Sequence, residues 1–275
     1  MIARVSLHDL ETDPKGCCAR LYESDAARWL LDDQLHPGGE RLTLRLARLA
    51  GVAPGARVID VACGSGASAL LLARELGCVT VGVDLGARAI EHARRATPAG
   101  ARASFLVGDA ETLPLPDASF DRAIAVQVLE YVRDTSAALA ELRRALRPGG
   151  RVLVWDVDWA TVSWQASDGK LMERVLAAWD KHLTHPSLPR ELAPHLRDAG
   201  FEHIQMDAHP FATTQLIPDA YGGSLVPLLE HYVVEQGGMS RQEAKRWADE
   251  QRKLGEHGEF FFTVTQFCFT ATSPG

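Results

Sequence analysis

The stretch Val58-Ile-Asp-Val-Ala-Cys-Gly-Ser-Gly66 decides the fold of this 275-residue chain. A run of apolar, mostly β-branched residues leads into a turn with glycines at 64 and 66, and a helical pattern follows over 67–77. Glycines in such a turn let the backbone fold back tightly and let a ligand approach without a Cβ in its way. The stretch therefore predicts a strand, a glycine-rich ligand loop and a helix.

The same alternation of strand and helix continues towards the C-terminus. Strand-like runs occur at 57–62, 79–83, 103–107, 121–126 and 151–157, and helical patterns separate most of them at 67–77, 87–96 and 135–147. Strands that are apolar along their whole length and alternate with helices form a parallel sheet that helices cover on both faces. The expected fold class is α/β.

Helical spacing also precedes the first strand. It occurs over residues 19–33 and again over 39–50, after the Pro37-Gly38-Gly39 break. Apolar residues at this spacing form the buried stripe of an amphipathic helix. We therefore predict that residues 1–54 form an N-terminal helical cap and that residues 55–275 form the main domain.

The C-terminal part of the chain has a looser pattern. Helices are expected at 167–182 and 189–199, and strands at 201–209 and 259–271. The 212–258 stretch between those strands is too long for a tight connection and is partly helical, at 224–236 and 241–254. Insertions of this length often form binding loops, so 212–258 is predicted to be a lid or a substrate-recognition insertion before the last strand.

Composition and charge exclude several classes of protein. Lys and Arg number 29 against 36 Asp and Glu, which gives a net charge of −7 and argues against a nucleic-acid partner held through its phosphates. No stretch reaches the ~20 apolar residues of a membrane helix, and the first residues show no apolar region of a signal peptide. Five cysteines without CxxC spacing predict neither a disulfide framework nor a metal site. We expect a cytoplasmic protein with no membrane partner, compatible with a homodimer.

Three acidic residues stand at the ends of three successive predicted strands. Gly64-x-Gly66-x-x-Ala69 satisfies a loose dinucleotide fingerprint, but Asp60 just before it would repel a pyrophosphate and favours a cationic ligand. Asp84 can accept hydrogen bonds from both hydroxyls of a ribose, and Asp109 can accept one from the exocyclic amine of adenine. Each acid alone can be explained as a helix cap or a turn residue, but all three together predict a nucleoside ligand with a positive charge.

The motifs around these acids resemble those of class I S-adenosylmethionine-dependent methyltransferases, in the style of the ubiquinone/menaquinone C-methyltransferase-like group that acts on small molecules. The motifs are DVACGSG, VGVDL, GDAETLPLPDASFD and LRPGGRVLV. The resemblance is strong over residues 55–157, looser over 17–54 and thin beyond 165. It implies a Rossmann-like, mostly parallel seven-stranded sheet, with S-adenosylmethionine as cofactor and S-adenosylhomocysteine as product.

The resemblance also implies roles for single residues at the cofactor. It puts the methionine moiety among Asp60, Ala62, Cys63, Gly64 and Gly66, the ribose at Asp84, the adenine at Leu85, its amine edge at Asp109 and Ala110, and the sulfonium beside Gln127. The chain departs from the family pattern at Ala62, where Gly is usual, and at Tyr131, where His is common. The second departure leaves the role of position 131 open.

The methyl acceptor is predicted from the distribution of aromatic residues. Five Phe, Trp and Tyr residues lie in 1–150 and fourteen in 151–275. Some of these belong to the core, but we expect a subset to form an aromatic wall of the acceptor pocket. That subset is Trp159, Trp164, Trp179, Tyr221 and Tyr232. The chain has neither the Asn/Asp-Pro-Pro-aromatic turn of base-amine methyltransferases nor the Pro-Cys pair of cytosine-C5 enzymes. The predicted acceptor is a small aromatic metabolite of indole, phenol or quinone type, with C-methylation slightly favoured.

Such an acceptor must lose a proton, and several side chains are candidates to take it or to close over the cofactor. The catalytic candidates are His182, His209, Asp158 and Tyr22, with Asp156, His185 and His231 as further proton acceptors.

Three alternatives remain open at this point. Adjacent Cys17 and Cys18, with Cys63 in the cofactor loop, would suit a thiol or arsenite methyltransferase. A non-catalytic S-adenosylmethionine-binding module would share the cofactor residues, and a nicotinamide oxidoreductase would share the glycine-rich loop. A test of whether the protein binds S-adenosylhomocysteine or NAD distinguishes the nicotinamide oxidoreductase from the other two alternatives.

Overall fold

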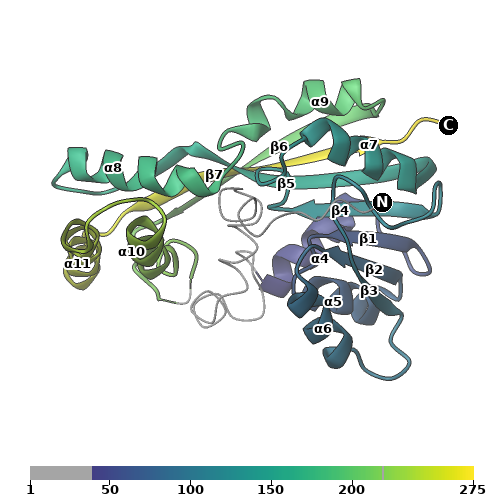
Figure 1. Ribbon diagram of the computed structural model, residues 1–275, viewed down its shortest axis with the longest axis horizontal. Helices are drawn as coiled ribbons and strands as arrows, with labels where there is room; N and C mark the ends of the chain where they lie inside the picture. The colour runs from purple at the N-terminus through teal and green to yellow at the C-terminus, as the bar shows by residue number, and fades with distance from the viewer. Residues whose placement is uncertain (1–38, 219) are drawn as a thin grey trace, which may run out of the picture.

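A single seven-stranded sheet organises the computed structural model, which describes residues 39–218 and 220–275 (Figure 1). The strand order is β3-β2-β1-β4-β5-β7-β6. The first five strands are parallel, and β7 runs antiparallel to both of its neighbours. The strands are β1 (Arg57–Val61), β2 (Val79–Asp84), β3 (Ala103–Val107), β4 (Phe120–Val126), β5 (Leu146–Trp164), β6 (Glu202–Thr213) and β7 (Phe262–Thr272). The Rossmann-like, mostly parallel sheet expected from the sequence is confirmed.

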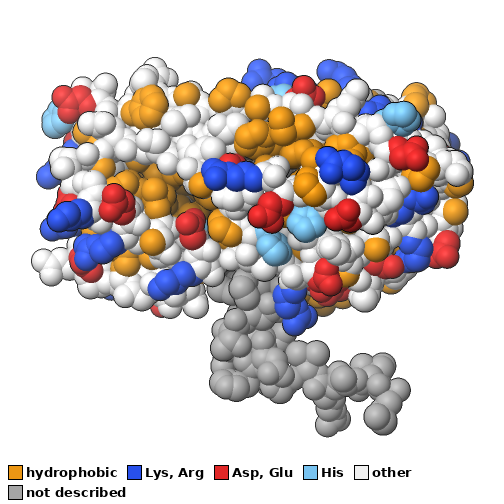
Figure 2. All heavy atoms as spheres, turned by 90° about the horizontal axis from the view of Figure 1, so that it is seen from above, with side chains coloured by type: hydrophobic (Ala, Val, Ile, Leu, Met, Phe, Trp, Pro, Cys, Tyr) orange, Lys and Arg blue, Asp and Glu red, His pale blue; other side chains and the backbone are white. Residues whose placement is uncertain are grey.

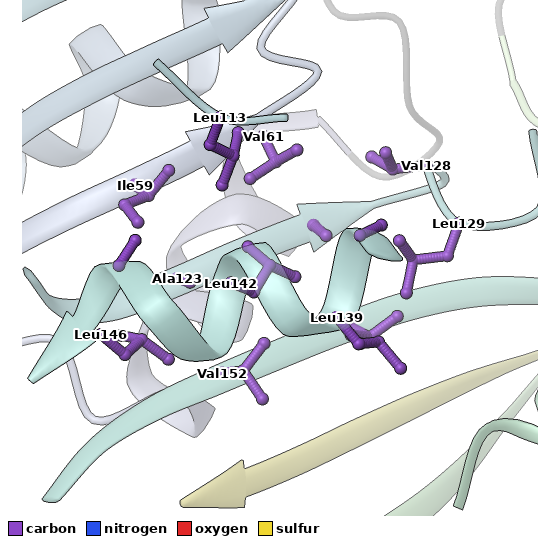
Figure 3. Packing of buried hydrophobic residues seen from close by; sticks show 14 of the residues in the cluster. Ile59, Val61, Leu113, Ala123, Val128, Leu129, Leu139, Leu142, Leu146 and Val152 are labelled. Carbon is purple, nitrogen blue, oxygen red and sulfur yellow. The ribbon is translucent and has the colours of Figure 1, made fainter. Parts of the chain in front are cut away.

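Helices cover both faces of this sheet. The described helices are α4 (Gly39–Leu49), α5 (Ala67–Leu76), α6 (Ala87–Ala96), α7 (Thr135–Ala145), α8 (Gly169–Trp179), α9 (Leu192–Asp198), α10 (Leu225–Glu235) and α11 (Arg241–His257). On one face, Leu139 and Leu142 of α7 pack against Ile59 of β1 and Val152 of β5 (Figure 3). Helix α9 joins the same cluster, whereas α4, α5 and α6 pack on the opposite face. Apolar burial on both sides explains why the parallel strands are apolar along their whole length.

A second hydrophobic cluster lies at the far end of the long strands β5 and β7. Helices α8, α10 and α11 gather at the end of the molecule that β5 and β7 reach, away from α4, α5 and α6 (Figure 1). Their apolar faces bury Trp179, Tyr232 and Trp247 together with Trp159 and Trp164 of β5. The helices predicted over 224–236 and 241–254 are confirmed as α10 and α11, and Ser240 begins α11 with a capping box to Glu243. The role of 212–258 as a lid or recognition insertion stays a prediction.

The fifth strand is longer than the sequence predicted. The expected strand over 151–157 extends from Leu146 to Trp164, because β7 pairs with it as far as Trp164 opposite Phe262. Asp156, Asp158, Trp159 and Trp164 therefore lie within a strand, whereas we expected Asp158 and the two tryptophans to follow it. Local composition at 158–164 is mixed, and the strand is extended by cross-strand pairing with a distant segment.

Part of the expected N-terminal cap is described. The helix expected over 39–50 is α4 (Gly39–Leu49), whose Leu46 and Ala47 pack against Val58 of β1 and Leu153 of β5. The predicted helix at 19–33 lies outside the described residues, and the 1–54 boundary remains a prediction.

None of the helices in the described ranges is long and apolar enough to cross a membrane. On the face shown in Figure 2, basic and acidic side chains are interspersed and neither forms a continuous field.

Candidate functional site

The glycine-rich loop after β1 is held by the carboxylate of Asp84. One carboxylate oxygen of Asp84 accepts a hydrogen bond from the Gly64 amide at 2.8 Å, and the other accepts one from the Gly86 amide at 2.7 Å. Asp84 is the last residue of β2, so this side chain links the carboxyl end of β2 to the loop that follows β1. A carboxylate at the end of the second strand is the group that accepts from the ribose hydroxyls of a nucleoside in open α/β sheets.

Asp60 places a second carboxylate under the same loop. It lies near the end of β1 and is 6% exposed, and its Oδ2 has no hydrogen-bond partner among the described residues. Burial, with a smaller contribution from the charge of Asp84, raises the pKa of Asp60 to about 7. A buried carboxyl oxygen without a partner is costly unless a donor reaches it, and a cationic ligand would supply that donor and favour ionisation.

Two residues without the freedom of glycine adopt left-handed backbone conformations at this edge of the sheet. Ala62 follows β1 and Gln127 follows β4, each with a φ of 54°. Such conformations cost about 1–3 kcal/mol in non-glycine residues and concentrate at functional sites. The backbone N–H of Gln127 donates a hydrogen bond to the backbone carbonyl of Trp155 at 2.6 Å. This bond holds the end of β4 beside β5. The usual family glycine at position 62 fits this backbone, and alanine keeps the conformation at some cost.

The next two strands contribute apolar and acidic side chains to the same edge. Leu85 after β2 and Val107 at the end of β3 are 42% and 46% exposed, unusually open for large apolar residues. Asp109 follows β3, where its Oδ1 accepts from the Glu111 amide at 2.9 Å, and Ala110 packs against the core beneath. An apolar ring with an amine at its rim, such as adenine, would cover the exposed leucine and valine.

Cys63 in the same loop is held as a thiol. Burial first, and the charges of Asp60 and Asp84 next, raise its pKa far above the usual value. The thiolate is the nucleophilic and metal-binding form of cysteine, so this residue is not activated. Among the described residues, no group of three or more His, Cys, Asp and Glu side chains could hold a metal ion.

These residues fit S-adenosylmethionine. The fit rests on the unpartnered Oδ2 of the buried Asp60 and on the acidic set formed with Asp84 and Asp109 at the carboxyl ends of β1, β2 and β3. A pyrophosphate in this place would face carboxylates, whereas a ligand with an ammonium, a sulfonium and a ribose would supply donors and positive charge. The nicotinamide alternative is therefore disfavoured by charge.

We expect Asp60→Asn to stabilise the ligand-free protein at high pH. The folded-state pKa of Asp60 is raised from 3.8 to about 7, so the folded state keeps a proton that the unfolded state loses between those values. The contribution of Asp60 to the free energy of unfolding therefore falls as the pH rises from 3.8 to about 7. At about pH 8 the variant should be more stable than the parent by about 1–3 kcal/mol, and at about pH 4 the difference should vanish. Urea denaturation at the two pH values measures this, and a difference independent of pH would contradict it.

A pair of buried carboxyls, Glu130 and Asp156, lies near Gln127 in the chain and in the sheet. Glu130 follows β4 and is fully buried, and its Oε2 accepts from the indole nitrogen of Trp159 at 3.0 Å. Asp156 on β5 is also buried, and its Oδ1 accepts from the Val128 amide at 3.1 Å. Burial raises the pKa of Glu130 well above its usual range, and the charge of Asp156 adds to that effect. Burial likewise raises the pKa of Asp156 to about 7.

Three of the predicted acceptor-pocket residues surround His182, and one of them, Trp159, also donates to Glu130. The His182 ring lies 3.9 Å from Trp179, 5.5 Å from Tyr232 and 5.9 Å from Trp159, measured between ring centroids. Trp164 contacts the same cluster through Phe262, and Phe262 lies 5.7 Å from Tyr221. The five predicted residues thus belong to one aromatic region, and whether they line a pocket stays a prediction.

The catalytic candidates from the sequence lie in different places. His182 is fully buried, its Nδ1 contacts the Trp179 carbonyl, and burial lowers its pKa to about 4. His209 on β6 lies away from His182. Its ring stacks on Trp155 with 4.8 Å between the ring centroids, and its Nδ1 lies 3.1 Å from Nη2 of Arg45 of α4. Asp158 is buried and paired with Arg190 at 2.7 Å. Tyr22 lies outside the described residues, so its role stays a prediction.

Sequence reasoning did not single out Glu130 as a candidate site residue. It stands in Val128-Leu-Glu-Tyr-Val132, an apolar run directly after a predicted strand. A single acid inside such a run is a signal, because carboxylates are almost never fully buried without a purpose or a partner. Asp156 was a candidate, but its proximity to Glu130 follows only from the pairing of β4 with β5.

Comparisons with known proteins agree with this geometry. Residues 59–154 match the family described as a methyltransferase domain. The chain is 32% identical over 230 residues to an uncharacterised 37.1 kDa protein of a Streptomyces fradiae transposon, covering 79% of this chain and 63% of that protein. It is 34% identical over 165 residues to the 27-O-demethylrifamycin SV methyltransferase of Amycolatopsis mediterranei, covering 59% and 60%. The chain thus spans less than two thirds of the length of these relatives.

Solved structures share the fold. Phosphoethanolamine N-methyltransferase 2 of Haemonchus contortus, solved with S-adenosyl-L-methionine, superposes with a TM-score of 0.63 at 20% identity, covering 99% of this chain and 61% of that one. The matched domain contains the glycine-rich loop with Asp60 and the strand end with Asp84. The matched domain, the named relatives and the shared fold together support a class I S-adenosylmethionine-dependent methyltransferase.

Proposed function

We propose that this protein transfers a methyl group from S-adenosylmethionine to a small aromatic metabolite of indole, phenol or quinone type. The proposal rests on one observation: the cofactor edge of the sheet and the buried aromatic cluster lie next to each other. The acid-lined cofactor edge ends at Gln127, and the aromatic cluster begins three residues later, where Glu130 accepts from the Trp159 indole. The relative named for 27-O-demethylrifamycin SV supports a small-molecule acceptor and brings a hydroxyl oxygen into consideration beside a ring carbon.

Bound S-adenosylmethionine supplies a methyl group on a positively charged sulfur, which is already an activated leaving group. The protein's own work is then to bind, to orient and to exclude water. Asp84 fixes the loop that would hold the methionine moiety, and Asp60 would accept from its ammonium. The buried tryptophans around Glu130 would keep water from the acceptor, since their rings pack edge to face.

Ligand-dependent stability tests the cofactor. S-adenosylhomocysteine at about one hundred times its dissociation constant should stabilise the protein by about 2.7 kcal/mol and raise the melting temperature by several degrees. NAD at the same concentration should leave the melting temperature unchanged, because the carboxylates of Asp60 and Asp84 repel its pyrophosphate. The reverse result would favour an oxidoreductase and would contradict the assignment.

Product analysis tests the reaction. The full chain with S-adenosylmethionine is offered a panel of phenols, indoles, quinones, thiols and arsenite, and mass spectrometry searches for products heavier by one CH₂. We expect methylated aromatic products. Tight binding of S-adenosylhomocysteine without any product would favour the non-catalytic binding module, and methylation of thiols or arsenite alone would favour the cysteine-based alternative.

A further inference from the structure

The Glu130–Asp156 pair is an unusual feature of this core. Both carboxyl groups are buried, and each has one oxygen, Oε1 of Glu130 and Oδ2 of Asp156, without a hydrogen-bond partner among the described residues. No described Lys or Arg forms a salt bridge with either. Two other buried or half-buried acids pair with cations, Asp158 with Arg190 and Glu141 with Arg144, whereas Asp60 at the cofactor edge also has an oxygen without a partner among the described residues. A pair kept for stability alone would have a cationic partner.

Further buried polar atoms without partners lie around this pair. They include Nε2 of His182 and the indole nitrogen of Trp179, counted among the described residues, and both rings lie within 6 Å of Trp159, measured between ring centroids. The Tyr221 hydroxyl is paired with the Gln266 side chain. Burial first and the charge of Glu130 second raise the pKa of Tyr221, so its hydroxyl lies within electrostatic reach of the pair. Several orphaned polar atoms in one apolar region indicate a place where a ligand or water supplies the missing hydrogen bonds.

Charge decides what kind of ligand fits. The charge of Asp156 acts on Glu130, and two interacting carboxyls in a low-dielectric interior share one proton at neutral pH and carry one negative charge. One carboxyl then donates and the other accepts, so the pair can hold a neutral hydroxyl group, whereas a phenolate or a carboxylate would be repelled. The aromatic rings of Trp159, Trp179 and Tyr232 surround the same region and suit a flat apolar body.

We propose that the Glu130–Asp156 pair binds the hydroxyl group of a phenolic acceptor and takes up its proton during methyl transfer, which makes the methylated atom a hydroxyl oxygen. This inference rests on the proposed function. The O–H bond of the acceptor breaks and an O–C bond to the methyl group forms. The electron pair of the S–C bond stays on sulfur, and the proton ends on the carboxylate. An anion and a cation are converted into neutral products, which a low-dielectric site favours.

The variant Glu130→Gln/Asp156→Asn tests the pair in the full chain. The amides keep the oxygens that accept from Trp159 and Val128, and they remove a buried charge, so folding should be retained. With phenolic acceptors from the panel, we expect the turnover to fall by about 10²–10⁴, the range for loss of a general base. The affinity for S-adenosylhomocysteine should change by less than about threefold, which separates this proposal from the cofactor assignment.

A binding measurement gives a readout that needs no turnover. The phenol 4-nitrophenol is added near its own pKa to the protein saturated with S-adenosylhomocysteine, and the visible absorbance of the phenolate is followed. We expect the parent protein to bind the neutral phenol, so that this absorbance falls, and the double variant to lose the decrease. The single variants Glu130→Gln and Asp156→Asn should each weaken it. Glu230→Gln, at a half-buried glutamate paired with Arg252, is the matched control and should behave as the parent.

Three outcomes would overturn the proposal while leaving the proposed function intact. The first is that the parent protein binds S-adenosylhomocysteine but leaves the phenolate absorbance unchanged. The second is that the double variant shows the same absorbance decrease and turnover as the parent. The third is that methyl transfer occurs only at ring carbons or at atoms that carry no proton. Failure to bind S-adenosylhomocysteine would instead contradict the cofactor assignment itself.

Discussion

Replacing Asp84 by Ala should raise the dissociation constant for S-adenosylhomocysteine by at least about 100-fold. The carboxylate accepts hydrogen bonds from the Gly64 and Gly86 amides at 2.8 Å and 2.7 Å, and it stands at the strand end where a carboxylate accepts from the ribose hydroxyls of a nucleoside. Hydrogen bonds to charged groups contribute about 1.5–3 kcal/mol each, and two of them correspond to about 10²–10⁴ in affinity. Asp84→Asn keeps one acceptor oxygen and should lie between the parent and the alanine variant. Isothermal titration calorimetry measures all three.

Asp121→Ala is the matched control for that experiment. Its carboxylate also accepts from a backbone amide, that of Arg57 at 2.8 Å, but it does so at the amino end of β1, opposite the cofactor edge. This variant should lose some stability and keep its affinity for S-adenosylhomocysteine. Equal loss of affinity in both variants would mean that Asp84 acts only through general stability and does not form the ribose site.

The second large effect is expected at Gly66. Gly66 has a φ of 84°, and a Cβ built there would lie 2.6 Å from Cε1 of Phe105 and 2.9 Å from Cβ of Ala93. Alanine in the left-handed region costs about 1–2 kcal/mol, and overpacking a core costs about 1–3 kcal/mol more. Gly66→Ala should therefore lower the free energy of unfolding by about 2–5 kcal/mol, a large fraction of the ~5–15 kcal/mol of a typical domain.

Gly77→Ala separates the two causes. Gly77 ends the same helix, α5, with a φ of 63°, and no atom lies within 4 Å of the Cβ that alanine would add. Its cost should be limited to the backbone term of about 1–2 kcal/mol. Chemical denaturation of the two variants gives the comparison. If both lose the same free energy, close packing of α5 against α6 and β3 is not what requires glycine at position 66.

The methyl-donor half of the protein could be predicted from its sequence because its signals are local. The apolar runs and the glycine turns can each be recognised from a few neighbouring residues. The same holds for the acids at the strand ends, Asp60, Asp84 and Asp109. The carboxyl ends of parallel strands must then meet at one edge, which brings the three acids together without further information. The one local surprise is Ala62, which adopts the left-handed conformation that glycine would adopt more easily.

The C-terminal half, with the aromatic cluster, could not be predicted to the same depth. The extension of β5 to Trp164 depends on pairing with Phe262, and the aromatic cluster needs α8, α10 and α11 to close over that extension. Asp156 looked like a residue at a strand end, and Glu130 looked like one acid in an apolar run. Their proximity arises only when β4 and β5 lie side by side.

The sequence by itself determined the fold class, the glycine-rich loop and the acids at the strand ends, because strand and helix periods and turn residues act over short distances. The tertiary structure alone decided which acids are buried together, which tryptophans share one cluster and how far the antiparallel strands extend. Those properties depend on contacts between segments about one hundred residues apart, such as Trp164 with Phe262, and no local pattern encodes such contacts.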